Sequence, residues 1–166
     1  LRLPRLADGS LVGAIAMTEP GAGSDLQGIR TTARHEHNCY VINGSKTFIT
    51  NGCNAGLVCL AVKTNTTASP MRSLSLIIVE TRNLAGYHGG RSLVKVGMHA
   101  HDTCEMFYDE VRVPEQNLLG GAEGRGLSQM MEQLPYERLT VAVSAIATAE
   151  RAVAITTKHA KERSAF

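Results

Sequence analysis

The stretch Tyr40-Val41-Ile42-Asn43-Gly44-Ser45-Lys46-Thr47-Phe48-Ile49-Thr50 decides the fold of the first part of the chain. Two short runs of strand-forming residues, 40–42 and 46–50, flank an Asn-Gly pair. Asn-Gly is the strongest short hairpin signal, because both residues tolerate positive φ. The stretch therefore predicts two antiparallel strands joined by a tight turn at Asn43-Gly44.

The same strand pattern continues on both sides of this stretch, from residue 11 to residue 113. Short β-branched or apolar runs alternate with Gly, Asn, Pro and Ser at roughly hairpin spacing. The runs 57–62 and 74–79 are apolar enough to be buried on both faces, and the polar stretch 63–73 between them reads as a loop. A last strand is expected over 104–111, before Pro114. This part of the chain is predicted to be all β.

The pattern changes after the glycines at 120, 121, 124 and 126, which predict a flexible junction. Beyond them the apolar residues follow a helical spacing, and the stripe consists of Leu139, Val143, Ile146 and Val153. Pro135 fits either a kink inside one helix or the first turn of a second helix. The chain is therefore predicted to be α+β, with a β domain followed by helix.

Composition excludes several classes of function. The chain has 166 residues, of which 43% are hydrophobic and 19% charged, enough for one core and a helical extension. Its net charge of +2 is scattered, so no nucleic-acid partner is expected. No run reaches the roughly 20 apolar residues of a membrane span, and residues 1–5 do not resemble a signal peptide. Because the chain lacks an initiator Met and stops in a helical pattern, we expect a piece of a longer protein.

Cysteine, histidine and acidic pairs give little support to a metal site or to paired acid-base chemistry. The four cysteines form no CxxC pair and are expected to be reduced, structural thiols: Cys39, Cys53, Cys59 and Cys104. The pairs His35-x-His37 and His99-x-His101 have metal-like spacing but no clear third ligand, so they are expected to be surface histidines. Asp109-Glu110 is expected to be solvated surface. No metal is predicted.

The segment Met17-Thr18-Glu19-Pro20-Gly21-Ala22-Gly23-Ser24-Asp25 follows an apolar run and predicts a compact turn at the end of a strand. Its glycines expose backbone N–H groups and its hydroxyls add donors, which suit a flat heterocycle or an anion. The alternative is a tight turn without a ligand. The segment is not a Rossmann fingerprint, because Leu26 replaces the third glycine, and Gly44-Ser45-Lys46-Thr47 is not a P-loop.

Glu137 is a candidate general base. It lies where the glycine-rich junction leads into an apolar helix, and its apolar neighbours are Met130, Met131, Leu134 and Leu139. Such neighbours would desolvate the carboxylate and raise its pKa. The alternative is a glutamate near a helix N-terminus that is favoured by the macrodipole, with Arg138 on the surface.

The segment 17–25 resembles the signature of acyl-CoA dehydrogenases, and the resemblance continues along most of the chain. The flanks of Glu137, Leu134-Pro135-x-Glu137-Arg138-Leu139, are most similar to the long-chain branch. The further matching motifs are Gly28-Ile29-Arg30-Thr31, residues 42–46 and 48–52, Val96-Gly97-Met98, Val111-Arg112-Val113-Pro114, Asn117-Leu118-Leu119-Gly120, Gly124-x-Gly126 and Lys161-Glu162-Arg163-Ser164-Ala165-Phe166.

This resemblance implies a mostly antiparallel, β-barrel-like middle domain over residues 1–115 and the start of a helical bundle domain over 116–166. It also implies FAD. The flavin-binding residues that it indicates are Ile15, Ala16, Met17, Thr18, Glu19, Pro20, Gly21, Ala22, Gly23, Ser24, Phe48, Ile49 and Thr50. Many family members have Trp in place of Phe48, and an aromatic ring is kept.

The resemblance also implies a substrate site. The residues that would contact acyl-CoA are Ser24, Met71, Arg72, Ser128, Pro135, Tyr136, Glu137 and Arg138. The long-chain and isovaleryl branches place the catalytic glutamate on the early helix, and Glu137 falls at that position. Glu137 is therefore the expected base, with Arg138 in support.

The implied activity is FAD-dependent α,β-dehydrogenation of a long-chain fatty acyl-CoA to trans-2-enoyl-CoA, in β-oxidation. Electron-transfer flavoprotein would accept the electrons, and the full-length protein would be a homotetramer, in the mitochondrial matrix of a eukaryote or the cytoplasm of a bacterium. The alternatives are a short- or branched-chain (isovaleryl-like) dehydrogenase, an acyl-CoA oxidase, and a non-catalytic nucleotide-binding β-module. A further alternative is that the isolated stretch binds FAD weakly or not at all, because later helices and a neighbouring subunit hold the adenosine half in the family.

Overall fold

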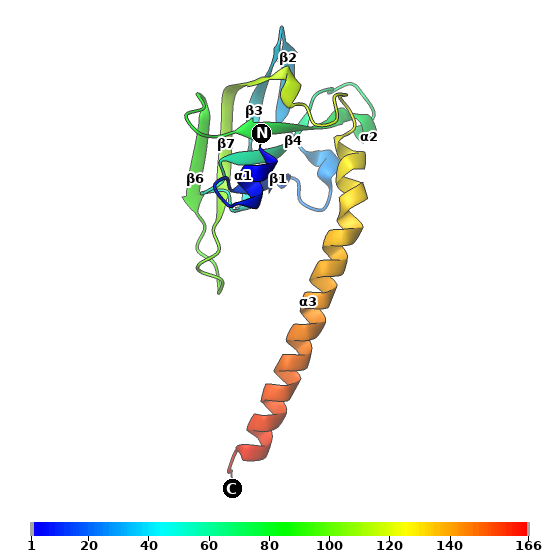
Figure 1. Ribbon diagram of the computed structural model, residues 1–166. Helices are drawn as coiled ribbons and strands as arrows, with labels where there is room; N and C mark the ends of the chain where they lie inside the picture. Colours follow the sequence, from blue (N-terminus) through cyan, green and yellow to red (C-terminus); the bar gives the residue numbers. More distant parts are fainter. Residues whose placement is uncertain (1, 166) are drawn as a thin grey trace. The chain divides into compact units, whose positions relative to one another are not determined.

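The computed structural model describes residues 2–165. Residues through Ser128 form one compact unit, and those from Gln129 onward form a second. The elements, most of which are labelled in Figure 1, follow each other in the order α1 (Leu3–Ala7), β1 (Gly13–Ala16), η1 (Leu26–Gly28), β2 (Thr32–Glu36), β3 (Cys39–Thr50), β4 (Leu57–Lys63), α2 (Pro70–Ser73), β5 (Leu74–Glu80), β6 (Tyr87–Ser92), β7 (Thr103–Pro114), η2 (Glu115–Asn117) and α3 (Gly126–Glu162). The α+β class predicted from the sequence is confirmed.

The first unit is built on a seven-stranded mixed sheet in the order β1-β4-β2-β3-β7-β6, with β5 paired to β4 off this path. Strands β2–β3, β3–β7, β4–β5 and β6–β7 pair antiparallel, whereas β1 and β2 pair with β4 in parallel. The sheet is therefore mostly antiparallel, as expected. Strand β1 lies in the sheet beside β4 up to Ala16, and the turn at residues 17–25 begins directly after it.

The hairpin predicted at Asn43-Gly44 is wrong, because β3 runs without interruption through both residues. The turn between β2 and β3 lies at residues 37 and 38 instead, where Glu36 pairs with Cys39 and His37 adopts a φ of 55°. Gly44 has a φ of 147°, and a Cβ on it would collide with Thr31. The Asn-Gly pair thus marks a place where two backbone segments approach closely, which is a known role of glycine within a strand besides forming turns.

The core lies mainly between strands β3, β4, β5 and β7. Strands β4 and β5 are buried on both faces, as their apolar sequences predict. The buried hydrophobic cluster consists of Ala16, Ala33, Tyr40, Ile42, Ile49, Ala55, Val58, Leu60, Val62, Ile77, Val79, Cys104, Met106, Tyr108, Val111 and Val113. Ala16 therefore belongs to the core, although it directly precedes the turn.

Three segments differ from the sequence prediction. The polar stretch 63–73 contains the short helix α2, and the last strand β7 extends at both ends beyond 104–111. Strand β6 was not anticipated, because its sequence Tyr-His-Gly-Gly-Arg-Ser holds two residues of low strand propensity and only one of high propensity. Its backbone hydrogen bonds to β7 hold it as a strand despite the low strand propensity of its sequence.

Two of the junction glycines, Gly124 and Gly126, are positions of close packing within the first unit. The N–H of Gly124 donates a hydrogen bond to Ser75 Oγ at 2.9 Å, and Gly124 has a φ of 74°. A Cβ on Gly124 would meet the carbonyl of Arg72, and one on Gly126 would meet the backbone of Ser75. These glycines let the chain pass directly over α2 and β5.

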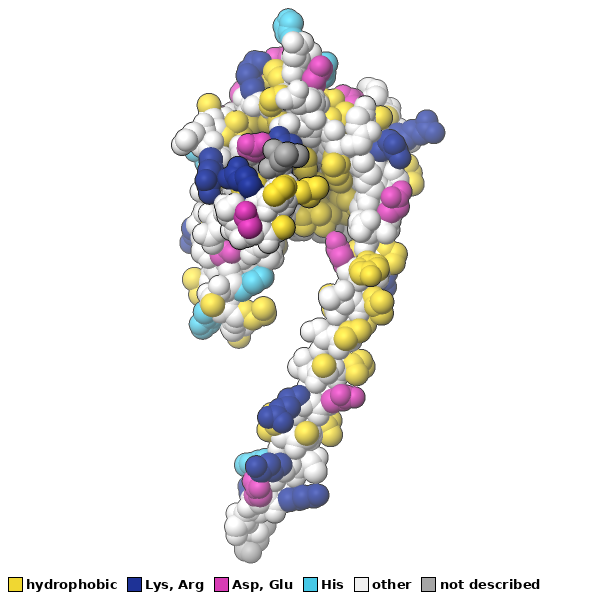
Figure 2. Space-filling view, viewed as in Figure 1, with side chains coloured by type: hydrophobic (Ala, Val, Ile, Leu, Met, Phe, Trp, Pro, Cys, Tyr) yellow, Lys and Arg dark blue, Asp and Glu magenta, His cyan; other side chains and the backbone are white. Residues whose placement is uncertain are grey.

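The long helix α3 contains Pro135, so the proline lies inside one helix and does not begin a second. The four residues of the apolar stripe all lie on this helix and are exposed in the described chain. Hydrophobic side chains occur along most of its length in Figure 2. By length and composition alone α3 could cross a membrane, but helices from the cores of bundles pass the same test.

Candidate functional site

The first cavity brings together the two segments that the sequence predicts to bind flavin. It has a volume of about 550 Å³ and is lined by Leu6, Gly13, Ala14, Ile15, Met17, Thr18, Phe48, Ile49, Thr50, Asn51, Leu57 and Cys59. The end of β1 supplies one side and the end of β3 the other. Six of the thirteen predicted flavin-binding residues therefore meet at one opening: Ile15, Met17, Thr18, Phe48, Ile49 and Thr50.

Phe48 reaches this cavity because β3 contains a β-bulge. Lys46 pairs with Met106 and Ile49 pairs with Cys104, so three steps on β3 face two steps on β7. Phe48 lies in the bulge with a φ of 57° and is 67% exposed. Bulges are common beside binding sites, where they redirect a side chain. The exposed Phe48 ring and the exposed Ile15 side chain give the cavity an apolar surface that suits a flat heterocycle.

The other predicted flavin-binding residues do not line the cavity: Ala16 is buried at the end of β1, and the remaining six lie in the turn. Glu19 and Ala22 are buried and exchange two backbone hydrogen bonds that close the turn. The exposed residues are Pro20, Gly21, Gly23 and Ser24. The Asp25 carboxylate accepts a hydrogen bond from the N–H of Gln27 and so begins η1. The turn is therefore compact, as the sequence predicts, and its tip is open to a ligand or to another part of the protein.

A buried ion pair supports the turn from below, and the sequence interpretation missed it. Lys46 Nζ lies 2.9 Å from Glu19 Oε1, and both side chains are almost fully buried. The same carboxylate accepts hydrogen bonds from the Thr31 hydroxyl at 2.6 Å, the N–H of Thr31 at 3.0 Å and the N–H of Arg30 at 2.6 Å. The signal that could have found this pair is a lysine within a strand, together with a glutamate in the turn that could offset its charge.

The two charges of this pair have shifted pKa values. Burial lowers the pKa of Lys46 to about 8, although Glu19 opposes the shift. Burial acts to raise the pKa of Glu19, but the donors on Thr31, Lys46 and Arg30 outweigh it and hold that pKa below its usual value. Glu19 is therefore ionised at neutral pH, and Lys46 is predominantly so.

A second cavity, of about 660 Å³, brings together three of the predicted substrate residues: Met71, Arg72 and Ser128. Its other lining residues are Asn65, Ala68, Ala122, Glu123, Gly124 and Arg125. Arg125 was missed by the sequence interpretation, and it gives the cavity a second guanidinium beside Arg72. Two arginines at one opening suit phosphate or carboxylate groups. Ser24, also predicted to contact substrate, does not line this cavity.

The remaining predicted substrate residues lie on α3, in the second unit: Pro135, Tyr136, Glu137 and Arg138. All four are exposed in the described chain. Of the neighbours expected to desolvate Glu137, Met130 is buried and Leu134 half-buried, but Met131 and Leu139 are exposed. The described residues therefore do not enclose the Glu137 carboxylate, and its role as a base remains a prediction.

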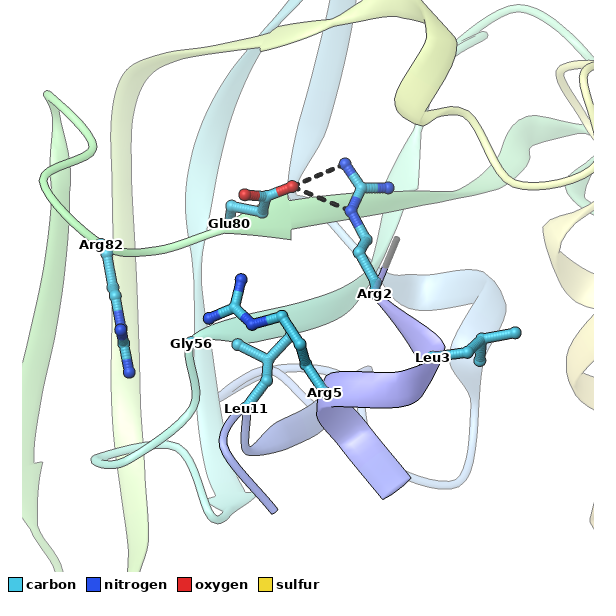
Figure 3. A pocket seen from close by; sticks show the side chains of 7 residues that line it. All are labelled: Arg2, Leu3, Arg5, Leu11, Gly56, Glu80 and Arg82. Carbon is cyan, nitrogen blue, oxygen red and sulfur yellow. Dashed lines mark hydrogen bonds and ion pairs between the residues drawn. The ribbon is translucent and has the colours of Figure 1, made fainter. Parts of the chain in front are cut away.

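A third cavity lies beside α1 and carries more positive than negative side chains. It is lined by Arg2, Leu3, Arg5, Leu11, Gly56, Glu80 and Arg82, which are shown in Figure 3. Arg2 Nη2 lies 2.7 Å from Glu80 Oε1, and the same nitrogen donates to Asn117 Oδ1 at 3.0 Å. Most of its charged side chains are exposed, so this opening shows no enclosed binding site.

The cysteines and histidines occupy structural or surface positions. All four cysteines are free, and burial raises the pKa values of the Cys59 and Cys104 thiols. His35 lies 3.0 Å from the Glu115 carboxylate and packs edge-on against Tyr40. Within residues 2–165 no three His, Cys, Asp or Glu side chains are grouped so as to hold a metal ion.

These features define a mixed-sheet β domain with a cavity where β1 and β3 end, joined to a helical segment, and comparisons with known proteins identify its family. A family model described as "Acyl-CoA dehydrogenase, middle domain" matches residues 14–111, and one described as "Acyl-CoA dehydrogenase, C-terminal domain" matches residues 124–166. The chain belongs to the acyl-CoA dehydrogenase family. The resemblance found in the sequence motifs is thereby confirmed.

Individual relatives agree with this assignment. The chain is 46% identical over 165 residues to the mitochondrial long-chain specific acyl-CoA dehydrogenase of Mus musculus, covering 99% of this chain and 38% of the relative. It is 38% identical to the mitochondrial isovaleryl-CoA dehydrogenase of Pongo abelii, covering 84% of this chain and 33% of the relative. The crystal structure of an acyl-CoA dehydrogenase from Geobacillus kaustophilus matches with a TM-score of 0.93 and 50% identity, covering 99% of this chain and 43% of that one. The chain thus spans well under half the length of these relatives.

Proposed function

We propose that the full-length protein is an FAD-dependent acyl-CoA dehydrogenase that converts a long-chain acyl-CoA to trans-2-enoyl-CoA. The observation that carries this proposal is the first cavity, where the ends of β1 and β3 meet around Thr18 and Phe48. Two segments 30 residues apart supply hydroxyl groups and an aromatic ring to one opening. Such a surface suits the edge and the face of a flat heterocycle.

FAD, when bound there, would accept a hydride from the β-carbon of the substrate. Phe48 would pack against the ring, and Thr18 and Thr50 would offer hydroxyl donors at its edge. The bulge that exposes Phe48 is held by the ladder between β3 and β7, so the aromatic surface is fixed before a ligand arrives. The residues present therefore fit the cofactor that the family resemblance implies.

Glu137 is the proposed base for the α-proton. The α-proton of a thioester is a weak acid, so a carboxylate can remove it only where water is excluded and where the carbonyl oxygen is stabilised by donors. Glu137 is exposed in the described chain, and the enclosure must come from other parts of the full-length protein and from the substrate. Arg138, its neighbour on α3, is proposed to support substrate binding.

The second cavity is the proposed site for the polar part of the CoA thioester. Arg72 and Arg125 supply positive charge there, and Ser128, whose hydroxyl donates to the carbonyl of Arg125 at 2.8 Å, adds a polar group. Met71, which is exposed, provides an apolar contact beside them. An opening that carries two arginines and further polar groups suits the phosphates and amides of CoA.

The preference for a long acyl chain rests on the relatives and on the flanks of Glu137. The mouse relative is described as long-chain specific, and the isovaleryl-CoA relative is less similar over less of the chain. Electron-transfer flavoprotein is proposed as the electron acceptor and a homotetramer as the assembly. Both named relatives are described as mitochondrial, so a mitochondrial location is proposed if the protein is eukaryotic and a cytoplasmic one if it is bacterial.

The test is anaerobic reduction of the flavin in the full-length protein by palmitoyl-CoA. The wild type is expected to lose its visible flavin absorbance rapidly, and Glu137→Gln is expected to slow this at least a hundredfold while retaining its flavin. Glu150→Gln is the matched control, because Glu150 is another exposed glutamate on α3. It is expected to react as fast as the wild type.

Other outcomes would contradict separate parts of the proposal. Equal rates in Glu137→Gln and the wild type would remove Glu137 from the mechanism. Reduction by isovaleryl-CoA but not by palmitoyl-CoA would replace the long-chain assignment with a branched-chain one. A full-length protein without flavin would contradict the proposed dehydrogenase activity as a whole.

A further inference from the structure

Lys46 is the largest side chain among the fully buried residues, and neither the predicted site nor the proposed chemistry uses it. Its side chain is 0% exposed, and that of Glu19 is 6% exposed. Taking two charges out of water is costly, and such a pair persists only where further hydrogen bonds satisfy both groups. Here the further hydrogen bonds join the turn 17–25 to Arg30, Thr31 and Lys46.

The ammonium group of Lys46 makes two contacts, and both are to the turn. Nζ lies 2.9 Å from Glu19 Oε1 and donates to the carbonyl oxygen of Met17 at 3.0 Å. The next residue on β3 repeats the pattern, because the N–H of Thr47 donates to the carbonyl oxygen of Thr18 at 3.0 Å. Two successive carbonyl groups at the end of β1 are thus directed toward β3.

This arrangement fixes the direction of a donor at the cavity. All peptide bonds of the described chain are trans, so the carbonyl of Met17 and the N–H of Thr18 point in opposite directions. Met17 and Thr18 line the first cavity, whereas Lys46 does not. Because Lys46 holds its carbonyl, the peptide between Met17 and Thr18 points its N–H away from the buried ammonium group.

The Glu19 carboxylate is held by three hydrogen bonds besides the one from Lys46. Thr31 contributes its N–H and its hydroxyl, and Arg30 contributes its N–H. Thr31 lies close enough because Gly44, opposite it on β3, has no side chain. The position of Lys46 is therefore set from three segments, around residues 19, 31 and 46.

We propose that Lys46 is a positioning residue of the cofactor site, which orients the Met17–Thr18 peptide so that its N–H and the Thr18 hydroxyl face the isoalloxazine ring. This inference rests on the proposed function, because it assigns FAD to the first cavity. Lys46 acts through the backbone of the turn and does not touch the ligand. Its removal would leave the cavity in place and misdirect its donors.

The test compares FAD binding to full-length apoprotein in the wild type and in Lys46→Met, which keeps an unbranched side chain of nearly the same length and removes its charge. The dissociation constant for FAD is expected to rise roughly tenfold or more. The visible absorbance bands and the reduction potential of the bound flavin are expected to shift, because donors at the ring edge affect both. A purely structural role for Lys46 would leave the spectrum and the potential of the bound flavin unchanged.

Val79→Ala is the matched control for lost stability. Val79 is fully buried on β5 and does not line the first cavity, so its truncation destabilises the same unit without touching the turn. Thr31→Val is a milder second variant, which removes one hydroxyl donor from Glu19 and keeps the shape of the side chain. It is expected to weaken FAD binding roughly threefold, and it decides the question if Lys46→Met does not fold.

The outcomes separate this inference from the proposed function. Wild-type protein that binds no FAD would overturn the proposed function and this inference together. Wild-type protein that binds FAD, with Lys46→Met or Thr31→Val giving the affinity and spectrum of Val79→Ala, would overturn only the role of Lys46. Weaker binding and a shifted spectrum in Lys46→Met or Thr31→Val, with neither in Val79→Ala, would establish it.

Discussion

Lys46 and Phe48 lie two positions apart on β3, yet Lys46 is fully buried and Phe48 is 67% exposed. In a regular strand two such residues point to the same face. The bulge between Lys46 and Ile49 separates them, so that one stabilises the turn from inside and the other faces the cavity. The extra residue of this bulge thus allows one short segment of β3 to do two things. Lys46 supports the proposed cofactor site from inside, and Phe48 gives that site an aromatic surface.

Replacement of Phe48 is expected to change cofactor affinity without a large change in stability. Phe48→Ala should weaken FAD binding about fivefold, because an aromatic contact of about 1 kcal/mol is lost. Phe48→Trp should bind at least as well as the wild type. Fluorescence titration of apoprotein with FAD measures both. Phe107→Ala, at an exposed phenylalanine on β7 that does not line the cavity, serves as the control and should bind FAD normally.

The stability of the protein should depend on pH through Glu19. Its pKa is held below the usual value of 4.5 in the folded state, so the unfolded chain binds the proton more readily. Glu19 therefore contributes stability that is complete above its unfolded pKa and is lost as the pH falls through the folded pKa. Thermal unfolding of full-length protein at about pH 7 and about pH 4 should show a larger loss in the wild type than in Glu19→Gln. An equal loss in both would mean that Glu19 is not held in its charged form.

Gly44→Ala is expected to destabilise the first unit by roughly 2 to 4 kcal/mol. The added Cβ would collide with Thr31, and the φ of 147° is unfavourable for any other residue. Urea unfolding of the two proteins gives the difference. Gly89→Ala on β6 is a suitable control, since a Cβ there would make only one ordinary contact, with the Tyr87 hydroxyl. A Gly44→Ala variant as stable as Gly89→Ala would show that β3 and Thr31 can separate without cost.

Arg125→Gln is expected to weaken binding of the CoA thioester about three- to tenfold at low salt, with a smaller effect at high salt. The reason is its position beside Arg72 in the second cavity, where it offers charge to an anionic ligand. Isothermal titration with a non-reactive acyl-CoA analogue at two salt concentrations measures it. Arg91→Gln, at an exposed arginine on β6 outside this cavity, should change neither affinity nor salt dependence.

The sequence predicted the parts of the fold that depend on local pattern. The continuous apolar runs predicted that β4 and β5 are buried on both faces, and the spacing from Leu139 to Val153 predicted a helix. Both predictions were correct, because each depends on the pattern within one element. The position of Asn43-Gly44 was not predictable in this way. Its backbone conformation depends on contacts with Thr31, just before β2, and with Glu110 on β7. Such contacts between distant residues leave no signal in the neighbouring sequence.

The candidate site shows the same division. The turn after β1 and the segment around Phe48 were found from their residues and from the family resemblance, and they meet at one cavity. Lys46 and Arg125 were missed, because a lysine in a strand and an arginine in a glycine-rich junction usually face solvent. Their significance depends on which distant residues the fold places beside them, here Glu19 and Arg72.

The ion pair between Glu19 and Lys46 also bears on the order in which the site can assemble during synthesis. Glu19 leaves the ribosome before Thr31 and Lys46, the residues that satisfy its charge, and these lie 12 and 27 positions further along the chain. Contacts between distant positions form only after the intervening loop has closed. The Glu19 carboxylate of the nascent turn therefore has no charged partner until β3 has been made and has docked, and we expect the turn to reach its final position on the sheet only at that stage.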